Sequence, residues 1–231
     1  MKTNLYRALL SLSLATLLVT QATAQELKKT SLQIRFSPLT LLDPRAAAIQ
    51  VGLQATVKNQ MGFSVDYGLP FKNFTKQLYT NPDLHSEQHR FFKIRAEAKY
   101  FMPPSWITPS KNSKPYFSAE VFYSPEEYRK TDDWLLKDKE AYHYDYSDVN
   151  RRMHGLCLKA GLEYVVVKRL VFDVFAGPGF RRIKIEHQPF KAVLREYDPP
   201  LDFYIEPVDK REGTFTRLHF ALGFKVGFIL L

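Results

Sequence analysis

Apolar and polar side chains alternate along most of this chain with a period of two residues. The segment 92–100 shows the pattern most fully: residues 93, 95, 97 and 99 are charged, and the residues between them are apolar. Successive side chains of a β-strand point to opposite faces of a sheet, so a strand separates these two sets completely. On a helix the charges would spread around the axis and no apolar face would form. The segment is therefore predicted to be a β-strand.

The same alternation recurs along the chain and predicts eight strands. They are expected at residues 32–38, 49–57, 62–69, 91–102, 116–123, 155–166, 170–177 and 219–230. After residue 24 no segment of the sequence approaches 18 uncharged apolar residues, which argues against a membrane protein built from helices. The fold class is predicted to be all-β.

Alternation alone does not say which face of each strand is buried. In a soluble barrel the apolar faces line the inside, whereas in a membrane barrel they face lipid and the polar faces line the lumen. Glycine recurs on the polar faces, where a narrow lumen favours it and a solvated face does not. Aromatic residues stand at the ends of the apolar faces, as membrane interfaces require: Tyr67, Tyr100, Tyr123, Tyr164 and Phe228. Both features favour a membrane barrel.

The expected connections differ in length on the two sides of such a barrel. On the outward side they are predicted at about 43–45, 70–90, 125–152 and 188–213, and on the inward side at 58–60, 103–114 and 168–169. Short periplasmic turns with long external loops are typical of outer-membrane barrels. The sequence therefore predicts an antiparallel up-and-down transmembrane β-barrel of eight strands with long extracellular loops.

The N-terminus has the three parts of a secretory signal peptide. Lys2 and Arg7 precede an apolar stretch over residues 8–19, and small residues at 22 and 24 form a cleavage site. This pattern marks a segment that is removed during export. Residues 1–24 are therefore expected to be a signal peptide, and residues 25–231 the outer-membrane barrel.

Composition adds two constraints to this picture. The only cysteine is Cys157, so an internal disulfide framework is excluded. The formal net charge is +9, which can indicate nucleic-acid binding. For an exported chain, attraction to an anionic envelope surface such as lipopolysaccharide is the favoured interpretation, and no nucleic acid is expected as a partner.

The segment Ala221–Phe228 combines glycine with hydrophobic or aromatic residues at alternating positions. It resembles the C-terminal signal that the outer-membrane assembly machinery recognises, although the sequence ends on Leu231 instead of an aromatic residue. The chain from residue 25 onward resembles the small OmpA/OmpX-type barrels and the uncharacterised outer-membrane barrels related to them. This resemblance implies the fold, an outer-membrane location and contact with the assembly machinery through the last strand. It implies little about activity.

If the polar faces point inward, six basic and five acidic side chains are expected in the lumen. An eight-stranded barrel is just wide enough for side chains to fill it, and buried charges are costly unless they are paired. The sequence predicts a plug of salt bridges with no open pore, and Glu120→Ala is expected to lower the thermal stability. The alternative to such a plug is that these charged residues lie on ordinary strand faces exposed to water. The residues are Arg35, Asp66, Lys93, Arg95, Glu97, Lys99, Glu120, Lys159, Glu163, Asp173 and Lys225.

Several residues are candidates for chemistry, and each has a simpler structural interpretation. His85 and His89 have a spacing that can bind a metal on a helix, but they fall in an expected loop. Barrel proteases place Asp and His at their external rim, so two segments are candidates for such a site: the aromatic and acidic stretch that contains His143, Asp145 and Asp148, and the pair Asp132 and Asp133. His154 lies on the lipid-facing side, without the serine that a barrel lipid acylhydrolase needs on the same strand.

Neither a phosphate-binding glycine loop nor a metal-spaced cysteine set occurs in the sequence, and Asn73–Thr75 is a glycosylation match of the kind that arises by chance. We therefore expect no catalytic residue, no metal and no cofactor. The favoured function is a non-enzymatic outer-membrane barrel with a role in envelope integrity or surface interaction, whose surface ligand is unknown. Two alternatives stay open: a soluble lipocalin-like barrel that carries an apolar ligand, and an outer-membrane barrel enzyme that acts on lipid or protein.

Overall fold

The computed structural model describes residues 30–43, 46–71, 89–103, 112–137, 140–195 and 210–231. They form ten strands and one short 3-10 helix, η2 (Pro38–Leu42). The strands are β1 (Ser31–Phe36), β2 (Ala48–Val57), β3 (Met61–Pro70), β4 (Arg90–Phe91), β5 (Lys93–Phe101), β6 (Ser113–Lys137), β7 (Glu140–Val167), β8 (Leu170–Phe190), β9 (Val193–Arg195) and β10 (Gly213–Ile229). No helix in this part of the chain is long and apolar enough to cross a membrane.

Eight of the strands close into a ring in the order β1, β2, β3, β5, β6, β7, β8 and β10. The ring closes because β10 pairs with β1, with Val226 opposite Phe36. All neighbours in the ring are antiparallel. The predicted fold class, an eight-stranded antiparallel barrel, is confirmed.

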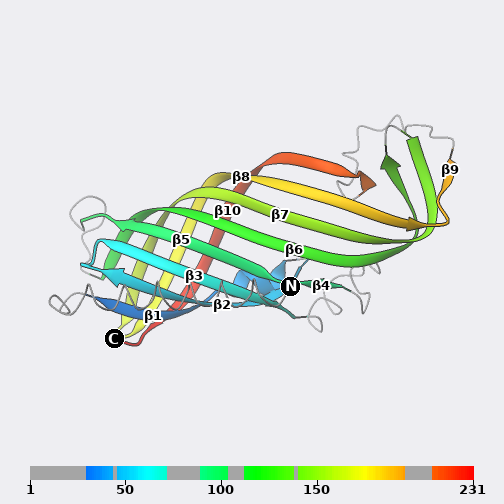
Figure 1. The fold of residues 1–231 in the computed structure, drawn as a ribbon. Helices are drawn as coiled ribbons and strands as arrows, with labels where there is room; N and C mark the ends of the chain where they lie inside the picture. The colour runs from blue at the N-terminus through cyan, green and yellow to red at the C-terminus, as the bar shows by residue number, and fades with distance from the viewer. Residues whose placement is uncertain (1–29, 44–45, 72–88, 104–111, 138–139, 196–209) are drawn as a thin grey trace, which may run out of the picture.

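Four strands continue far beyond the others on one side of the ring. Figure 1 shows β6, β7 and β8 running to the distal end of the molecule, where β9 lies, while the C-terminus lies at the opposite end. β10 accompanies β8 as far as Gly213, which is opposite Ile185. We call this extension, formed by the distal parts of β6, β7, β8 and β10 together with β9, the arm.

The arm corrects one prediction. Residues 125–152 were expected to be a loop, but 125–137 and 140–152 continue β6 and β7 as one long hairpin. The expected loop at 188–213 is shortened in the same way, because β8 reaches Phe190 and β9 follows. Period-two contrast is lost here because the outward face of the arm is polar and part of its inner face is also charged. The expected loops at 70–90 and 103–114 lie mostly outside the described residues.

The side chains of the ring are sorted as a membrane barrel requires. On the outside Val65 and Leu158 are 58% and 61% exposed, whereas on the inside Arg35 and Lys225 are 2% and 1% exposed. The soluble alternative, in which the apolar faces line a cavity, is therefore wrong for these strands. A closed ring satisfies the backbone hydrogen bonds that lipid cannot satisfy, so the chain is a transmembrane β-barrel.

Candidate functional site

The polar faces of seven strands meet in the lumen and form a bonded network of charges. Arg35 comes from β1, Glu97 from β5, Lys159 from β7 and Lys225 from β10, and all of them are buried. Alternation along each strand places these residues inside, and the closure of the ring brings together residues far apart in sequence. The result is one cluster instead of separate surface pairs.

We call the part of the network nearer the arm its upper part, and the part nearer the C-terminus its lower part. Glu97 lies at the centre of the upper part. Its carboxylate lies 2.7 Å from Lys159 Nζ, 3.2 Å from Lys225 Nζ and 3.5 Å from Arg35 Nη2. It also accepts a hydrogen bond of 2.8 Å from Ser118 Oγ. One buried carboxylate thus contacts three buried cations, each of which also lies next to a second acid: Asp66, Glu120 or Asp173.

Glu120 is the second acid in this upper part. Its carboxylate lies 2.7 Å from Lys159 Nζ, and its other oxygen accepts from Arg95 Nη1 at 3.3 Å. Arg95 is only partly buried, so this pair marks the upper edge of the network.

Lys99 holds the lower part together. Its Nζ donates to Glu163 at 2.7 Å and to Asp173 at 2.5 Å, and it lies 4.1 Å from the centre of the Tyr116 ring. The hydroxyl of Tyr116 donates to Asp173 at 2.5 Å. The Lys99 ammonium group therefore lies between two acids and an aromatic ring.

Arg35 connects the two parts. Its guanidinium donates to Asp66 at 3.2 Å and to Gln54 at 2.5 Å, and lies 3.6 Å from Asp173. Asp66 in turn accepts from Lys225 at 2.7 Å. Planar guanidinium groups present several donors in a fixed fork, which suits a residue that joins several acids.

The structure therefore brings ten of the eleven predicted residues into one network. The exception is Lys93, which bonds instead to Asp43 at 2.6 Å and to the Ala46 carbonyl at 2.7 Å. Sequence reasoning missed the uncharged members because it selected charges alone. They occupy the same inward phase of their strands, which is the signal that could have found them: Gln54, Ser64, Tyr116 and Ser118.

Apolar side chains fill the lumen above and below the charges. Below them, Phe101, Tyr116 and Phe175 pack together. Above them, Phe122, Cys157 and Ala221 form a second cluster, in which Cys157 is a buried free thiol. In the arm a third cluster contains Tyr128, Val149, Ile183 and Ile185.

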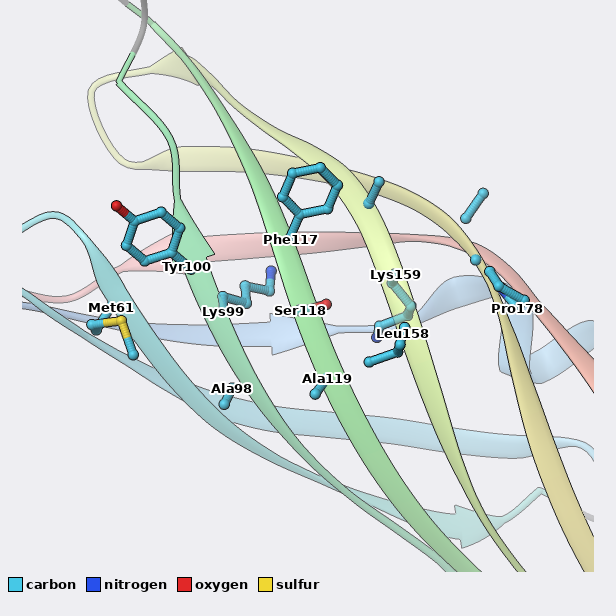
Figure 2. A pocket seen from close by; sticks show the side chains of 13 residues that line it. Met61, Ala98, Lys99, Tyr100, Phe117, Ser118, Ala119, Leu158, Lys159 and Pro178 are labelled. Carbon is cyan, nitrogen blue, oxygen red and sulfur yellow. The ribbon is translucent and has the colours of Figure 1, made fainter. Parts of the chain in front are cut away.

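The outer surface carries a belt of apolar residues with aromatic rims. At the outer rim the Phe92 ring contacts both Tyr67 and Tyr123, with ring centres 6.1 Å apart in each contact. Tyr100 and Tyr164 stand near the inward ends of β5 and β7. Between the rims lies a shallow groove of about 520 Å³ over small side chains such as Ala98 and Ala119, with Tyr100, Phe117 and Leu158 at its edges (Figure 2).

The belt ends abruptly at the base of the arm. The last apolar row across four strands is Val121, Leu156, Phe180 and Leu218, and the next row is Tyr123, His154, Arg182 and Thr216. Farther out the outward face is polar, with Arg129 and Asp148 joined by two hydrogen bonds of 2.7 and 2.9 Å. The arm therefore lies outside the lipid-facing belt.

Some aromatic and apolar side chains of the arm are nevertheless exposed to water. Tyr146 stacks on Phe190 with ring centres 4.9 Å apart, and the Arg129 guanidinium lies 4.5 Å from the Tyr146 ring. Phe190 is exposed, as are Val193 and Leu194 of β9. We call Arg129, Tyr146, Phe190, Val193 and Leu194 the arm patch.

At the tip of the arm, residues 210–212 dock on β6. Asp133 accepts from Lys210 at 2.8 Å and from the Trp134 backbone N–H at 2.9 Å, and Lys210 lies 4.4 Å from the Trp134 ring. Burial works to raise the pKa of Asp133, but these hydrogen bonds and the charge of Lys130 outweigh it and hold the pKa below its ordinary value.

This docking is expected to weaken in acid. A lowered pKa in the folded state stabilises the docked form at every pH above the ordinary aspartate value of about 3.9, and the stabilisation is lost as the pH falls below that value. Because the Asp133 side chain is partly exposed, the effect is expected to be about 1 kcal/mol or less. In a Trp106→Phe background, Trp134 fluorescence should change between pH 5 and pH 2.5, and Asp133→Asn should abolish the change. A titration that Asp133→Asn leaves intact would exclude this carboxylate as its cause.

The catalytic candidates are not assembled into a common site. His143 Nε2 lies 3.2 Å from Asp132 Oδ1, with both side chains open to water. Asp145 pairs with Lys191, and Asp148 pairs with Arg129. The four side chains therefore form three separate surface pairs.

The remaining histidine candidates are His85, His89 and His154, and the two that the structure describes do not form a common site. His89 is buried between the rings of Phe91 and Tyr128. His85 and Asn73 lie outside the described residues, and His154 lies on the outward face as predicted. No group of three possible metal ligands occurs in the described part of the chain.

No protein-family model matches this sequence, and no curated protein matches it. Among solved structures, the chain is similar to the N-terminal β-barrel domain of OprF from Pseudomonas aeruginosa, with 12% identity, coverage of 87% of this chain and 96% of that chain, and a TM-score of 0.37. It is similar to CarO of Acinetobacter baumannii, with 9% identity, coverage of 87% and 95%, and a TM-score of 0.39. For Neisserial surface protein A the identity is 14%, the coverage 86% and 94%, and the TM-score 0.34. At these values the assignment to a transmembrane barrel rests on the closed ring and its sorted faces.

Proposed function

We propose that this chain is a non-enzymatic outer-membrane barrel with a plugged lumen that serves envelope integrity or surface interaction. The observation that carries the proposal is the combination of a closed ring, an apolar outer belt and a lumen filled by paired charges. This arrangement anchors the chain in lipid, and the paired charges are expected to block a continuous aqueous path through the lumen. The working surface is then the part outside the membrane, which is the arm.

The type of transmembrane structure indicates which membrane the chain occupies. Closed β-barrels of this size are the form taken by outer-membrane proteins. The expected signal peptide at residues 1–24 supplies the export that this location requires, although it lies outside the described residues. The last strand, β10, is proposed as the segment that the assembly machinery recognises.

The plug is supported by the way the charges are satisfied. Glu97 is bonded to three cations and Lys99 to two acids, and all of them are buried. A buried ion pair is tolerated when its geometry is good and the remaining polar atoms are bonded. Opening a pore here would separate these partners, so the network favours an anchor over a channel.

The surface role is supported by the arm patch. Tyrosine and arginine are enriched where proteins bind one another, and exposed apolar residues that cluster on a surface mark contact sites. Phe190, Val193 and Leu194 lie beyond the outer end of the belt, so lipid does not account for them. A protein or glycan surface outside the cell is the kind of ligand that this patch suits.

The first experiment tests the anchor. Membranes from cells that express the full chain are extracted with carbonate, and the pellet is run on a denaturing gel with and without boiling. We expect the protein to remain in the outer-membrane fraction and its band to shift on boiling, because a closed barrel has no free edge at which detergent can begin to unfold it. Release into the soluble fraction would contradict the proposal.

The plug is tested in vesicles that contain the folded protein. Vesicles with this chain are expected to swell in a small sugar no faster than vesicles without protein, because the paired side chains block the lumen. Vesicles that contain a known wide porin provide the positive control. Rapid swelling would show an open pore and would replace the anchor by a channel.

A further inference from the structure

Two neighbouring rows at the base of the arm place basic side chains directly opposite one another. His154 on β7 is opposite Arg182 on β8, and Arg152 is opposite Lys184 in the next row outward. All four side chains lie on the outer face and are exposed. Like charges directly opposite on adjacent strands are destabilising, so this arrangement is unusual for a surface without a ligand.

The acids nearby do not balance this cluster. Glu186 lies 2.6 Å from Lys184 Nζ and 3.8 Å from Arg152 Nη2. Arg182 forms no ion pair within the described part of the chain. Glu186 is therefore the one carboxylate paired with this cluster among the described residues, and it reaches Arg152 and Lys184 only. The cluster keeps a net positive charge even with His154 neutral.

The position of the cluster says which anion would meet it. The row next to it on the membrane side is the last apolar row of the belt, in which Phe180 and Leu218 are 61% and 77% exposed. A molecule that lies along β8 would place an anionic group on the cations and an apolar chain on Phe180. Such a molecule is an anionic lipid of the outer leaflet.

We infer that Arg152, Arg182 and Lys184 bind the phosphate of a membrane lipid whose acyl chains lie against Leu156, Phe180 and Leu218. This inference rests on the proposed function, because the apolar row must face lipid. A free phosphate ion would use only half of the surface, since it makes no contact with the apolar row. Guanidinium groups pair with phosphate through two parallel hydrogen bonds, which suits the two arginines.

The test compares two variants that lose the same charge at opposite ends of the barrel. Arg182→Gln/Lys184→Gln removes two cations of the cluster. Lys168→Gln/Arg169→Gln removes two cations from the tight turn between β7 and β8 at the other membrane surface. The folded full chain in detergent is titrated with lipid A, a bisphosphorylated glycolipid, and retained lipid is measured by native mass spectrometry.

Wild type and the turn variant are expected to retain the lipid. The cluster variant is expected to bind it about thirtyfold more weakly, since each of the two lost basic residues contributes about fivefold near an anionic lipid surface. Lipid A from which both phosphates have been removed should bind wild type as weakly as lipid A binds the cluster variant. Inorganic phosphate at the concentration of the lipid should not displace it.

Three results would overturn the inference. They are equal retention of lipid A by the cluster variant and wild type, equal retention of the dephosphorylated lipid by wild type, and displacement by inorganic phosphate, which would show a free-anion site. The band shift on boiling confirms that each variant is folded. Loss of wild type from the carbonate pellet would instead disprove the membrane anchor, so the two failures are distinguishable.

Discussion

Replacing Glu97 with alanine is expected to destabilise the barrel by about 3–5 kcal/mol, the cost of breaking a buried ion pair from one side. The carboxylate lies within 3.5 Å of cationic nitrogens from Arg35, Lys159 and Lys225. Its removal leaves three buried cations to share the remaining acids and opens a space in the centre of the lumen. The measurement is urea unfolding of the protein in lipid vesicles, followed by tryptophan fluorescence and by the band shift on boiling.

Two further variants control for this result. Glu97→Gln keeps the shape and can still accept the Ser118 hydrogen bond, so it isolates the loss of charge. Glu186→Ala removes an acid from the exposed face of the arm, and its effect is expected to be within about 0.5 kcal/mol. If Glu97→Ala costs no more than Glu186→Ala, the lumen charges behave as solvated side chains and the plug is disproved.

The sequence predicted the strands well wherever the two faces meet different surroundings. On β5, Ala98 faces the lipid side and Lys99 the lumen, so the contrast between neighbours is maximal. On the arm the contrast disappears: Glu126 is buried inside and Glu127 lies outside. Both faces of a strand can carry charge once water reaches the outer face. Hydrophobicity then no longer alternates with a period of two, and the strand cannot be predicted from that pattern.

The membership of the lumen network could be predicted, but its pairing could not. Phase along each strand places Lys99 and Asp173 inside. Their 2.5 Å contact joins residues 74 positions apart and depends on the stagger between strands around the closed ring. Phase alone is not sufficient for membership of the network. Lys93 has the correct phase, but it lies beyond the network toward the outer end of the barrel and pairs with Asp43.

The arm patch and the cationic cluster could not be predicted from the sequence for a different reason. Arg152 and Lys184 are 32 positions apart, and nothing in either segment indicates that they become neighbours. Only the register of β7 on β8 places them side by side. Sites on the outer wall of a barrel are assembled across strands in this way, whereas short sequence motifs report sites that lie within one turn or one loop.

Replacing Leu158 with arginine is the sharpest test of which solvent the outer face meets. Leu158 lies on β7 between Tyr164 at the inner rim and Leu156 in the last apolar row, and it points outward. Leu158 lies one row inside the outer edge of the belt, so an arginine there is expected to cost about 2 kcal/mol. This lies between the cost of about 2–4 kcal/mol at the middle of the bilayer and that of about 0–1 kcal/mol near the interface. The cost is measured by urea unfolding in vesicles.

The matched control for this substitution is Asn150→Arg. Asn150 lies on the same strand and the same outward phase, opposite Glu127 and beyond the last apolar row, so the strand, the direction of the side chain and the charge change are shared. Both variants would cost little if the outer face met water, because an exposed arginine is well solvated wherever it stands. A large difference between them requires a low-dielectric medium around Leu158 and not around Asn150. It therefore measures where the membrane ends along β7, and with it how much of this strand belongs to the arm.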